Sequence, residues 1–409
     1  MSQTKITAIG TSPRKRDVRL DFFRGIAMLI IFMAHVPENR WQNFIPANFG
    51  PSDATEMFVF CSGYASALAF GSLYSSHGFL MGTSRIGLRC FQVYWAHLAM
   101  FITVATVIII GTNVMAGLVA DPVNYIVALN LMPFMDDPVN GLVGLMTLTY
   151  VPNYFDILPM YLVLLAMIPV VMLLGNIHRY APIAAIALLW LANQVFNPQL
   201  PAEWWSDRTW FFDPFAWALI FFTGFCISIG WLKTPQPNRI LFWTAVIFVV
   251  ALIPLSHWQT AQNYEWMREF RVTFWSGFDK TEFGYLRYLH FLALAYICVT
   301  LLKGREDMLH HPALKPVIKV GQQALATFIS SMILAQIGGM VLDYLGRSPL
   351  TYALVNLSGF ALLVGIAYSM AFFKKQPWRK PASAGNEATV KPAPRATGYS
   401  LQGDRRASA

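Results

Sequence analysis

Long apolar runs, separated by short polar segments, recur along almost the whole chain. The centre of a bilayer offers the backbone no hydrogen-bond partner, so a segment that crosses it forms a helix of roughly 20 apolar residues. The pattern therefore predicts an all-α, polytopic membrane protein with about ten transmembrane helices. The predicted segments are approximately 20–37, 53–75, 89–117, 155–175, 180–197, 211–232, 239–256, 285–303, 317–342 and 349–373.

One further apolar stretch, 122–153, does not fit a simple membrane helix. It is interrupted by four prolines and by the adjacent Asp136 and Asp137. Proline interrupts the hydrogen bonding of a helix interior, and carboxylates are costly in lipid. For this stretch we predict a long loop with an interfacial or re-entrant piece.

Composition supports a membrane protein. Hydrophobic residues make up 56% of the 409 residues and charged residues only 12%, which is more apolar surface than one soluble core could bury. The four cysteines show no C-x-x-C spacing, so neither a disulfide framework nor a metal site is predicted. No permanently bound cofactor is expected either.

The distribution of positive charge indicates an orientation. With the N-terminus in the cytoplasm and ten crossings, 23 of the 30 Lys and Arg residues would face the cytoplasm and seven the opposite side. The net charge of +9 is thus mostly a topology signal, and no basic cluster indicates binding of nucleic acid. We predict a basic N-terminal tail (1–18), a membrane domain (19–373) and a basic, disordered tail (374–409), with both termini cytoplasmic.

The first predicted helix carries two ionisable residues on one face. Arg24 and His35 are eleven residues apart, which on an α-helix is three turns and about 20°, with a rise of roughly 16 Å. Asp21 precedes Arg24 by three residues and could hold its guanidinium group or cap the helix. In the predicted orientation, Arg24 lies near the cytoplasmic surface and His35 toward the outer half of the membrane.

Two carboxylates stand at the outer end of the second predicted helix. Asp53 and Glu56 are three residues apart, and a short external hairpin could bring them level with His35. A histidine beside a carboxylate is a general base with a fixed tautomer, and ionisable groups at this depth are usually functional. We therefore predict that His35, Asp53 and Glu56 are catalytic.

Simpler interpretations exist for other polar and aromatic residues. Arg24 lies near a helix end, where an arginine often anchors the helix by reaching the interface. Arg85 and Arg89, at the cytoplasmic start of the third helix, contribute to the positive-inside bias whatever else they bind. The aromatic residues of the outer loops could form an interfacial belt.

Several segments, in a fixed order, carry a family resemblance. They are RDVRLDFFRG (16–25), with His35 completing R-x10-H, GPSDATEMFVFCSGYASALAFG (50–71), SRIGLRCFQVYWAH (84–97), YFDILPMYLVLLAMIP (154–169), WFFDPFAWALIFFTG (210–224), YLRYLHFLALAY (285–296) and VGQQALATF (320–328). With them the chain resembles the OpgC family of osmoregulated periplasmic glucan succinyltransferases, which is similar in turn to the acyltransferase-3 membrane family.

The resemblance implies a bacterial inner-membrane O-acyltransferase that takes a succinyl group from cytoplasmic succinyl-CoA to hydroxyls of a periplasmic glucan. His35 would take the proton from a glucose hydroxyl, and Glu56 or Asp53 would orient it. Arg24 could meet CoA phosphates or the thioester region, and Arg85 and Arg89 suit phosphate binding. The expected partners are therefore an acyl-CoA donor, a glucan acceptor and membrane lipid.

Residues on the predicted outer side could form the binding site for the acceptor. Aromatic faces suit the apolar faces of glucose rings, and charged or polar side chains can hydrogen-bond hydroxyls. The predicted acceptor-binding residues are Trp205, Trp210, Trp266, Arg268, Arg287 and His290.

Two alternatives remain open. Another acyl group, such as acetyl, could go to another envelope polysaccharide. A second cationic contact for the donor's free carboxylate would separate this case from succinyl transfer, but the sequence does not place one. A transporter is the other alternative, and it predicts internal repeats with paired broken helices. The R-x10-H block of the first helix has no counterpart in the sixth.

Overall fold

The computed structural model describes residues 17–378 except residue 121, and all regular secondary structure within that part of the chain is helical. Most of both predicted tails lies outside the described residues. Each predicted membrane segment contains a helix. The helices within these segments are α1 (Val18–His35), α2 (Ala54–Ser66), α3 (Ser72–Ala116), α7 (Ile157–Ile177), α8 (Ala181–Phe196), α9 (Pro214–Ile229), α10 (Arg239–Ser256), α14 (Tyr285–Leu302), α15 (Lys315–Gln322), α16 (Ala324–Leu345) and α17 (Pro349–Lys374).

Among the described residues, six helical runs are long and apolar enough to cross a membrane, and these are Ala54–Ala116, α7, α10, α14, α16 and α17. Two shorter helices, α8 and α9, are also apolar. Helix α1 has 18 residues but carries Arg19, Asp21 and Arg24. The all-α architecture is thus confirmed, and the long apolar helices support a polytopic membrane protein, whereas ten crossings and cytoplasmic termini stay predictions.

The run Ala54–Ala116 is two arms of a hairpin. A π-helical stretch, Ala67–Gly71, lies between α2 and α3, and Gly78 within α3 has a φ of 80°, which a glycine adopts without strain. The hydroxyls of Tyr74 and Thr83 are 3.1 Å apart, whereas nine residues of straight helix rise about 13 Å. The chain therefore turns back at Gly78, and the second arm begins before the start at residue 89 that hydropathy predicts.

The proline-rich stretch 122–153 forms short helices instead of one long one, as the loop prediction requires. Val139, Leu142 and Val143 are exposed apolar residues, which suits contact with lipid. The short helices of this region are α4 (Tyr125–Ala128), α5 (Met132–Asp136) and α6 (Pro138–Thr147). A second group of short helices, between α10 and α14, comprises α11 (Trp258–Asn263), α12 (Glu265–Thr273) and α13 (Trp275–Phe278).

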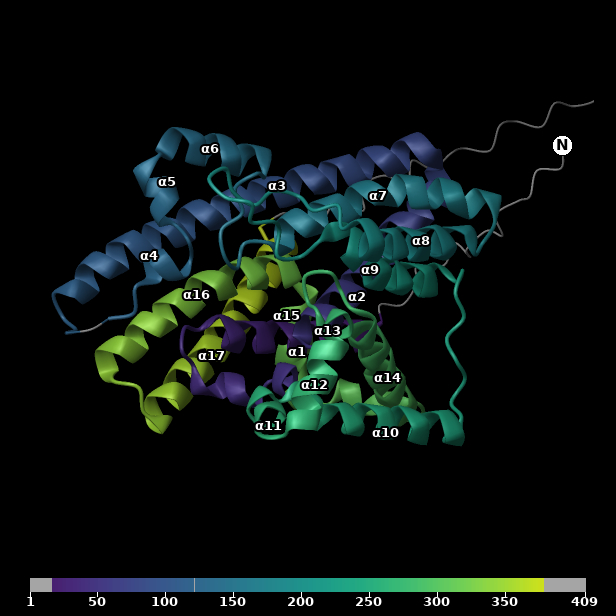
Figure 1. Ribbon diagram of the computed structural model, residues 1–409. Coiled ribbons are helices and arrows are strands. Elements are labelled where there is room, and N and C mark those ends of the chain that lie inside the picture. The colour runs from purple at the N-terminus through teal and green to yellow at the C-terminus, as the bar shows by residue number, and fades with distance from the viewer. Residues whose placement is uncertain (1–16, 121, 379–409) are drawn as a thin grey trace, which may run out of the picture.

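Glycines bring the central helices into backbone contact. A Cβ on Gly63 of α2 would lie 1.9 Å from the carbonyl oxygen of Phe221 in α9, and one on Gly321 of α15 would lie 1.9 Å from that of Asp21 in α1. Small residues at helix crossings are the usual packing mode in membranes. Figure 1 shows α1, α2 and α15 at the centre, between α7–α9 on one side and α16 and α17 on the other. The helices that carry His35 and Asp53 are therefore tightly held.

Candidate active site

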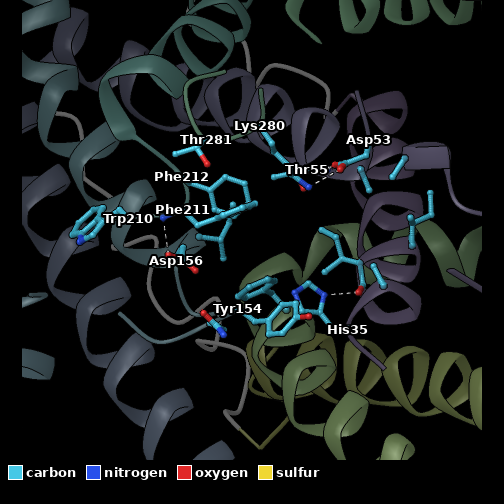
Figure 2. Close-up of a pocket in the computed structure, with 18 of the residues that line it drawn as sticks. His35, Asp53, Thr55, Tyr154, Asp156, Trp210, Phe211, Phe212, Lys280 and Thr281 are labelled. Carbon is cyan, nitrogen blue, oxygen red and sulfur yellow. Dashed lines mark hydrogen bonds and ion pairs between the residues drawn. The ribbon is translucent and has the colours of Figure 1, made fainter. Parts of the chain in front are cut away.

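A cavity of about 690 Å³ lies where several helix ends converge. It takes in the end of α1 and the starts of α2, α7 and α9, together with the segment before α14 (Figure 2). The predicted ten-crossing topology places all of these ends on the outer side. The lining residues are Ile30, Ile31, Ala34, His35, Ile45, Ala47, Asp53, Ala54, Thr55, Ala128, Asn153, Tyr154, Asp156, Ile157, Asp207, Arg208, Thr209, Trp210, Phe211, Phe212, Lys280, Thr281 and Phe328.

His35 lines this cavity with a defined tautomer. Its Nδ1 lies 2.6 Å from the carbonyl oxygen of Ile31, one turn earlier in α1. A carbonyl only accepts, so Nδ1 carries the proton and Nε2 keeps its lone pair. No other side chain or backbone group of the described residues hydrogen-bonds this imidazole, and the ring of Tyr154 packs against it edge to face at 5.2 Å. His35 is therefore arranged as a proton acceptor.

The predicted orientation of His35 by a carboxylate is not what the structure shows. Neither Asp53 nor Glu56 hydrogen-bonds His35, and the Ile31 carbonyl orients the ring instead. The reason is local. A histidine at the last position of a helix can reach back to the carbonyl four residues earlier, because a carbonyl oxygen has a second lone pair that can accept a hydrogen bond from a side chain.

Glu56 lies behind the cavity wall and is fully buried. Its Oε1 accepts a hydrogen bond from Arg287 Nε at 2.8 Å and lies 2.6 Å from Arg287 Nη2 as an ion pair. Its Oε2 accepts a hydrogen bond from the backbone N–H of Asp53 at 2.7 Å. Together Asp53 and Glu56 form a capping box at the start of α2. These contacts describe a structural group, and no contact with the cavity supports the predicted catalytic role of Glu56.

Asp53 does line the cavity, but the negative charge of its carboxylate is neutralised by neighbouring cations. Its Oδ2 lies 2.6 Å from the Lys280 ammonium and 3.7 Å from the Arg287 guanidinium, and its Oδ1 caps the N–H of Thr55. Burial alone would raise the pKa of Asp53, but the charges of Lys280 and Arg287 outweigh burial and hold this pKa well below its usual range. Asp53 is thus an anion at neutral pH and a poor proton acceptor.

Arg287 and His290, predicted to bind the acceptor, belong to the same buried region. Their exposed fractions are 6% and 2%, and neither lines the cavity. The Ser52 hydroxyl lies 2.7 Å from His290 Nδ1, and a Cβ on Gly50 would clash with the imidazole. These contacts hold the loop before α2 against α14. We call this group the ion-pair cluster: Asp53, Glu56, Lys280 and Arg287, with Ser52 and His290 beside them.

The predicted aromatic acceptor residues are dispersed. Trp210 lines the cavity, and its Nε1 donates to the Leu148 carbonyl at 3.2 Å. Trp205 packs on Trp204 instead, with ring centroids 4.5 Å apart. Trp266 and Arg268 are exposed on α12 and do not line the cavity.

The three arginines predicted to bind the donor do not line the cavity. Arg24 lies partway along α1, and Arg85 and Arg89 lie on α3, where Arg85 is exposed. The Arg89 guanidinium lies 3.4 Å from the Gln92 side-chain oxygen. Their contact with CoA stays a prediction.

Many cavity residues had no role assigned from sequence, and among those that carry polar groups are Tyr154, Asp156, Arg208 and Lys280. Burial raises the pKa of Asp156 to about 6, against the opposing effects of the Phe211 N–H and the Arg208 charge. Asp156 immediately precedes the apolar run of α7, as Asp53 precedes that of α2. A polar residue at the predicted outer start of a membrane helix was thus an available signal for Asp156.

A family model described as "OpgC protein" matches residues 16–375 of the chain. The matched range includes all the residues that line the cavity. No curated protein and no solved structure matches the chain.

Proposed function

The chain belongs to the OpgC family, and on that basis we propose that it is a membrane O-acyltransferase that moves a succinyl group from succinyl-CoA to hydroxyls of osmoregulated periplasmic glucans. The observation that carries this proposal is His35, whose Nε2 is a free proton acceptor in a cavity built from predicted outer helix ends. An acyl transfer to a hydroxyl requires such a base.

The chemistry assigned to His35 is proton removal. As the acceptor hydroxyl attacks the thioester carbonyl, its proton passes to His35 Nε2, a new C–O bond forms and the C–S bond breaks. The CoA thiolate leaves, and the imidazolium returns the proton to the thiolate or to water. The Ile31 carbonyl, 2.6 Å from Nδ1, stabilises the imidazolium that forms.

The cavity suits a sugar acceptor in its size and lining. Its volume of about 690 Å³ lies within the common range for small-ligand sites. Tyr154, Trp210, Phe211 and Phe212 supply aromatic surface, and carboxylate, amide and hydroxyl groups stand among them. This mixture is suited to a molecule with apolar ring faces and hydroxyl edges.

The succinyl donor is favoured by two cations in the wall. A succinyl group carries a free carboxylate that an acetyl group lacks, and Lys280 and Arg208 both line the cavity. Lys280 has three N–H donors, of which one faces Asp53. Arg208 forms an ion pair with Glu203, in which Arg208 Nε lies 2.6 Å from Glu203 Oε2. We assign the CoA phosphates to Arg24, Arg85 and Arg89.

The test is mass spectrometry of periplasmic glucans from a glucan-producing strain that lacks its own acylation, complemented with this gene. We expect a mass gain of one succinyl unit with the wild type and with His178→Ala, an exposed control. His35→Ala should lower the amount of succinylated glucan formed by a factor of about 10² to 10⁴ when the variant is present in the membrane at the same abundance as the wild type.

Other outcomes separate the alternatives. An acetyl-sized gain would keep the role of His35 and replace the donor. Unmodified glucans in the presence of inserted wild-type protein would refute the proposed acceptor.

A further inference from the structure

Asp156 occupies a helix start but does not cap the helix. An aspartate at this position normally accepts a hydrogen bond from an N–H of the first turn. Asp17, Asp53 and Asp213 do so at the starts of α1, α2 and α9. The Asp156 side chain makes no such bond with α7. Its carboxylate is therefore directed elsewhere.

The carboxylate of Asp156 is directed to the cavity. The residue is only 3% exposed, yet it lines the cavity wall, and its Oδ1 accepts a hydrogen bond of 3.1 Å from the backbone N–H of Phe211 (Figure 2). No other residue in the described part of the chain hydrogen-bonds this carboxylate. A buried carboxylate can accept about four hydrogen bonds, so Asp156 has unused capacity on the cavity side.

The turn that carries Asp156 also reaches His35. Tyr154 has a φ of 71°, a left-handed conformation that is strained for a bulky residue. Such strain persists where the surrounding structure requires it, and it is concentrated at functional sites. The Tyr154 ring contacts the His35 imidazole, while Asp156, two residues later, contacts the opposite loop at Phe211. The short turn 154–156 thus positions both the His35 imidazole and the Asp156 carboxylate.

We propose that Asp156 binds the acceptor: its free oxygen accepts a hydrogen bond from a sugar hydroxyl that neighbours the hydroxyl deprotonated by His35. The inference rests on the proposed function, because it takes the acceptor to be a glucan. Adjacent hydroxyls of a glucose unit can then meet His35 and Asp156 together, and the Tyr154 and Trp210 rings offer surface for the ring faces. Asp156 fixes which hydroxyl is presented to the base.

The experiment uses the full chain in lipid nanodiscs and a linear gluco-oligosaccharide as the probe. Calorimetry gives the Kd of the oligosaccharide, and transfer assays with succinyl-CoA give KM and kcat. For Asp156→Asn we expect Kd and acceptor KM to rise about tenfold or more, because a charged acceptor is lost, with kcat within about threefold.

Two variants serve as controls. Asp213→Asn alters another buried carboxylate at a helix start, outside the cavity, and should leave Kd and KM unchanged. His35→Ala should retain oligosaccharide binding and lose kcat. A wild type that binds the oligosaccharide without acylating it would refute the proposed function, and the Asp156 variant would still decide the inference through Kd.

A second measurement does not depend on the variant folding. Monodeoxy glucosides, tested one position at a time against wild-type protein, should include one that competes about tenfold more weakly than the parent glucoside. If Asp156→Asn folds, it should no longer distinguish that analogue from the parent. Equal competition by every monodeoxy analogue, an unchanged Kd in Asp156→Asn, or no oligosaccharide binding by the wild type would each overturn the inference.

Discussion

The cavity wall and the ion-pair cluster behind it both hold ionisable side chains, but they differ in how those groups are satisfied. In the cluster, both carboxylate oxygens of Glu56 are occupied by Arg287 and the Asp53 N–H. On the wall, His35 and Asp156 each hydrogen-bond to one other residue of the described chain, and both line the cavity. An ionisable group within a membrane domain is therefore a poor guide to catalysis by itself, whereas unfilled hydrogen-bonding capacity beside a cavity is informative.

Asp53 and Lys280 stand on the boundary between the two regions. Both line the cavity, and they pair with each other at 2.6 Å. Asp53 also contacts Arg287, which links the wall to the cluster. A substrate charge at Lys280 would thus act on a network that also holds the start of α2.

The largest expected effect is on the cluster. Glu56→Ala removes the close partner of the buried Arg287 and leaves it, among the described residues, only Asp53, at 3.7 Å. Breaking a buried ion pair costs about 3–5 kcal/mol. We expect little folded protein and a much lower Tm in detergent. The double variant Glu56→Leu with Arg287→Met should recover most of the loss, because it removes both charges. A stable Glu56→Ala protein that loses only kcat would make Glu56 catalytic and remove the distinction between the regions.

The next effect is a pH dependence of stability at the wall. Burial raises the pKa of Asp156 from 3.8 to about 6. Between these values the unfolded chain loses the proton while the folded protein keeps it, so stability falls as pH rises from about 4 to about 6. Above pH 6 the free energy of unfolding is lower by about 3 kcal/mol than it is below pH 4.

Asp156→Asn does not ionise and should not show this loss. Melting temperatures across pH 4 to 8 should therefore diverge, with the variant more stable than the wild type above pH 6. Parallel curves would mean that Asp156 is not penalised by burial, and the wall would then be as well satisfied as the cluster.

A smaller effect is expected at the boundary. Lys280→Gln removes a cation that can meet the free carboxylate of a succinyl group, and a hydrogen bond to a charged group is worth about tenfold or more in affinity. We expect the preference for succinyl-CoA over acetyl-CoA, measured as a ratio of kcat/KM values, to fall about tenfold. An equal loss for both donors would assign Lys280 to the cluster alone.

The smallest effect is expected outside both regions. Trp266 and Arg268 are exposed on α12, and the Arg268–Glu265 ion pair is solvent-accessible at 3.5 Å. Trp266→Ala and Arg268→Ala should change stability by less than about 0.5 kcal/mol and the acceptor KM by less than about twofold. A tenfold rise in KM would restore the sugar-binding role predicted for these loop residues.

The sequence by itself determined the all-helical class, the positions of the long apolar helices and the presence of His35 and Asp53 at a predicted outer site. These features are local. Apolar runs are encoded residue by residue, and a polar residue at the end of such a run lies at a membrane surface whatever the rest of the fold does. The turn at Gly78 was located less well. Polar residues around it interrupt the hydropathy signal between residues 75 and 89, whereas the helices on both sides continue up to Gly78.

Only the tertiary structure decided which ionisable groups are satisfied and which are free. Glu56 meets Arg287 across 231 positions and Asp53 meets Lys280 across 227, so spacing in the chain carries no information about either pair. The same holds for Asp156, which leaves its own helix for the N–H of Phe211, 55 positions away. Hydropathy acts on each residue separately, whereas a hydrogen bond depends on two groups that packing alone brings together.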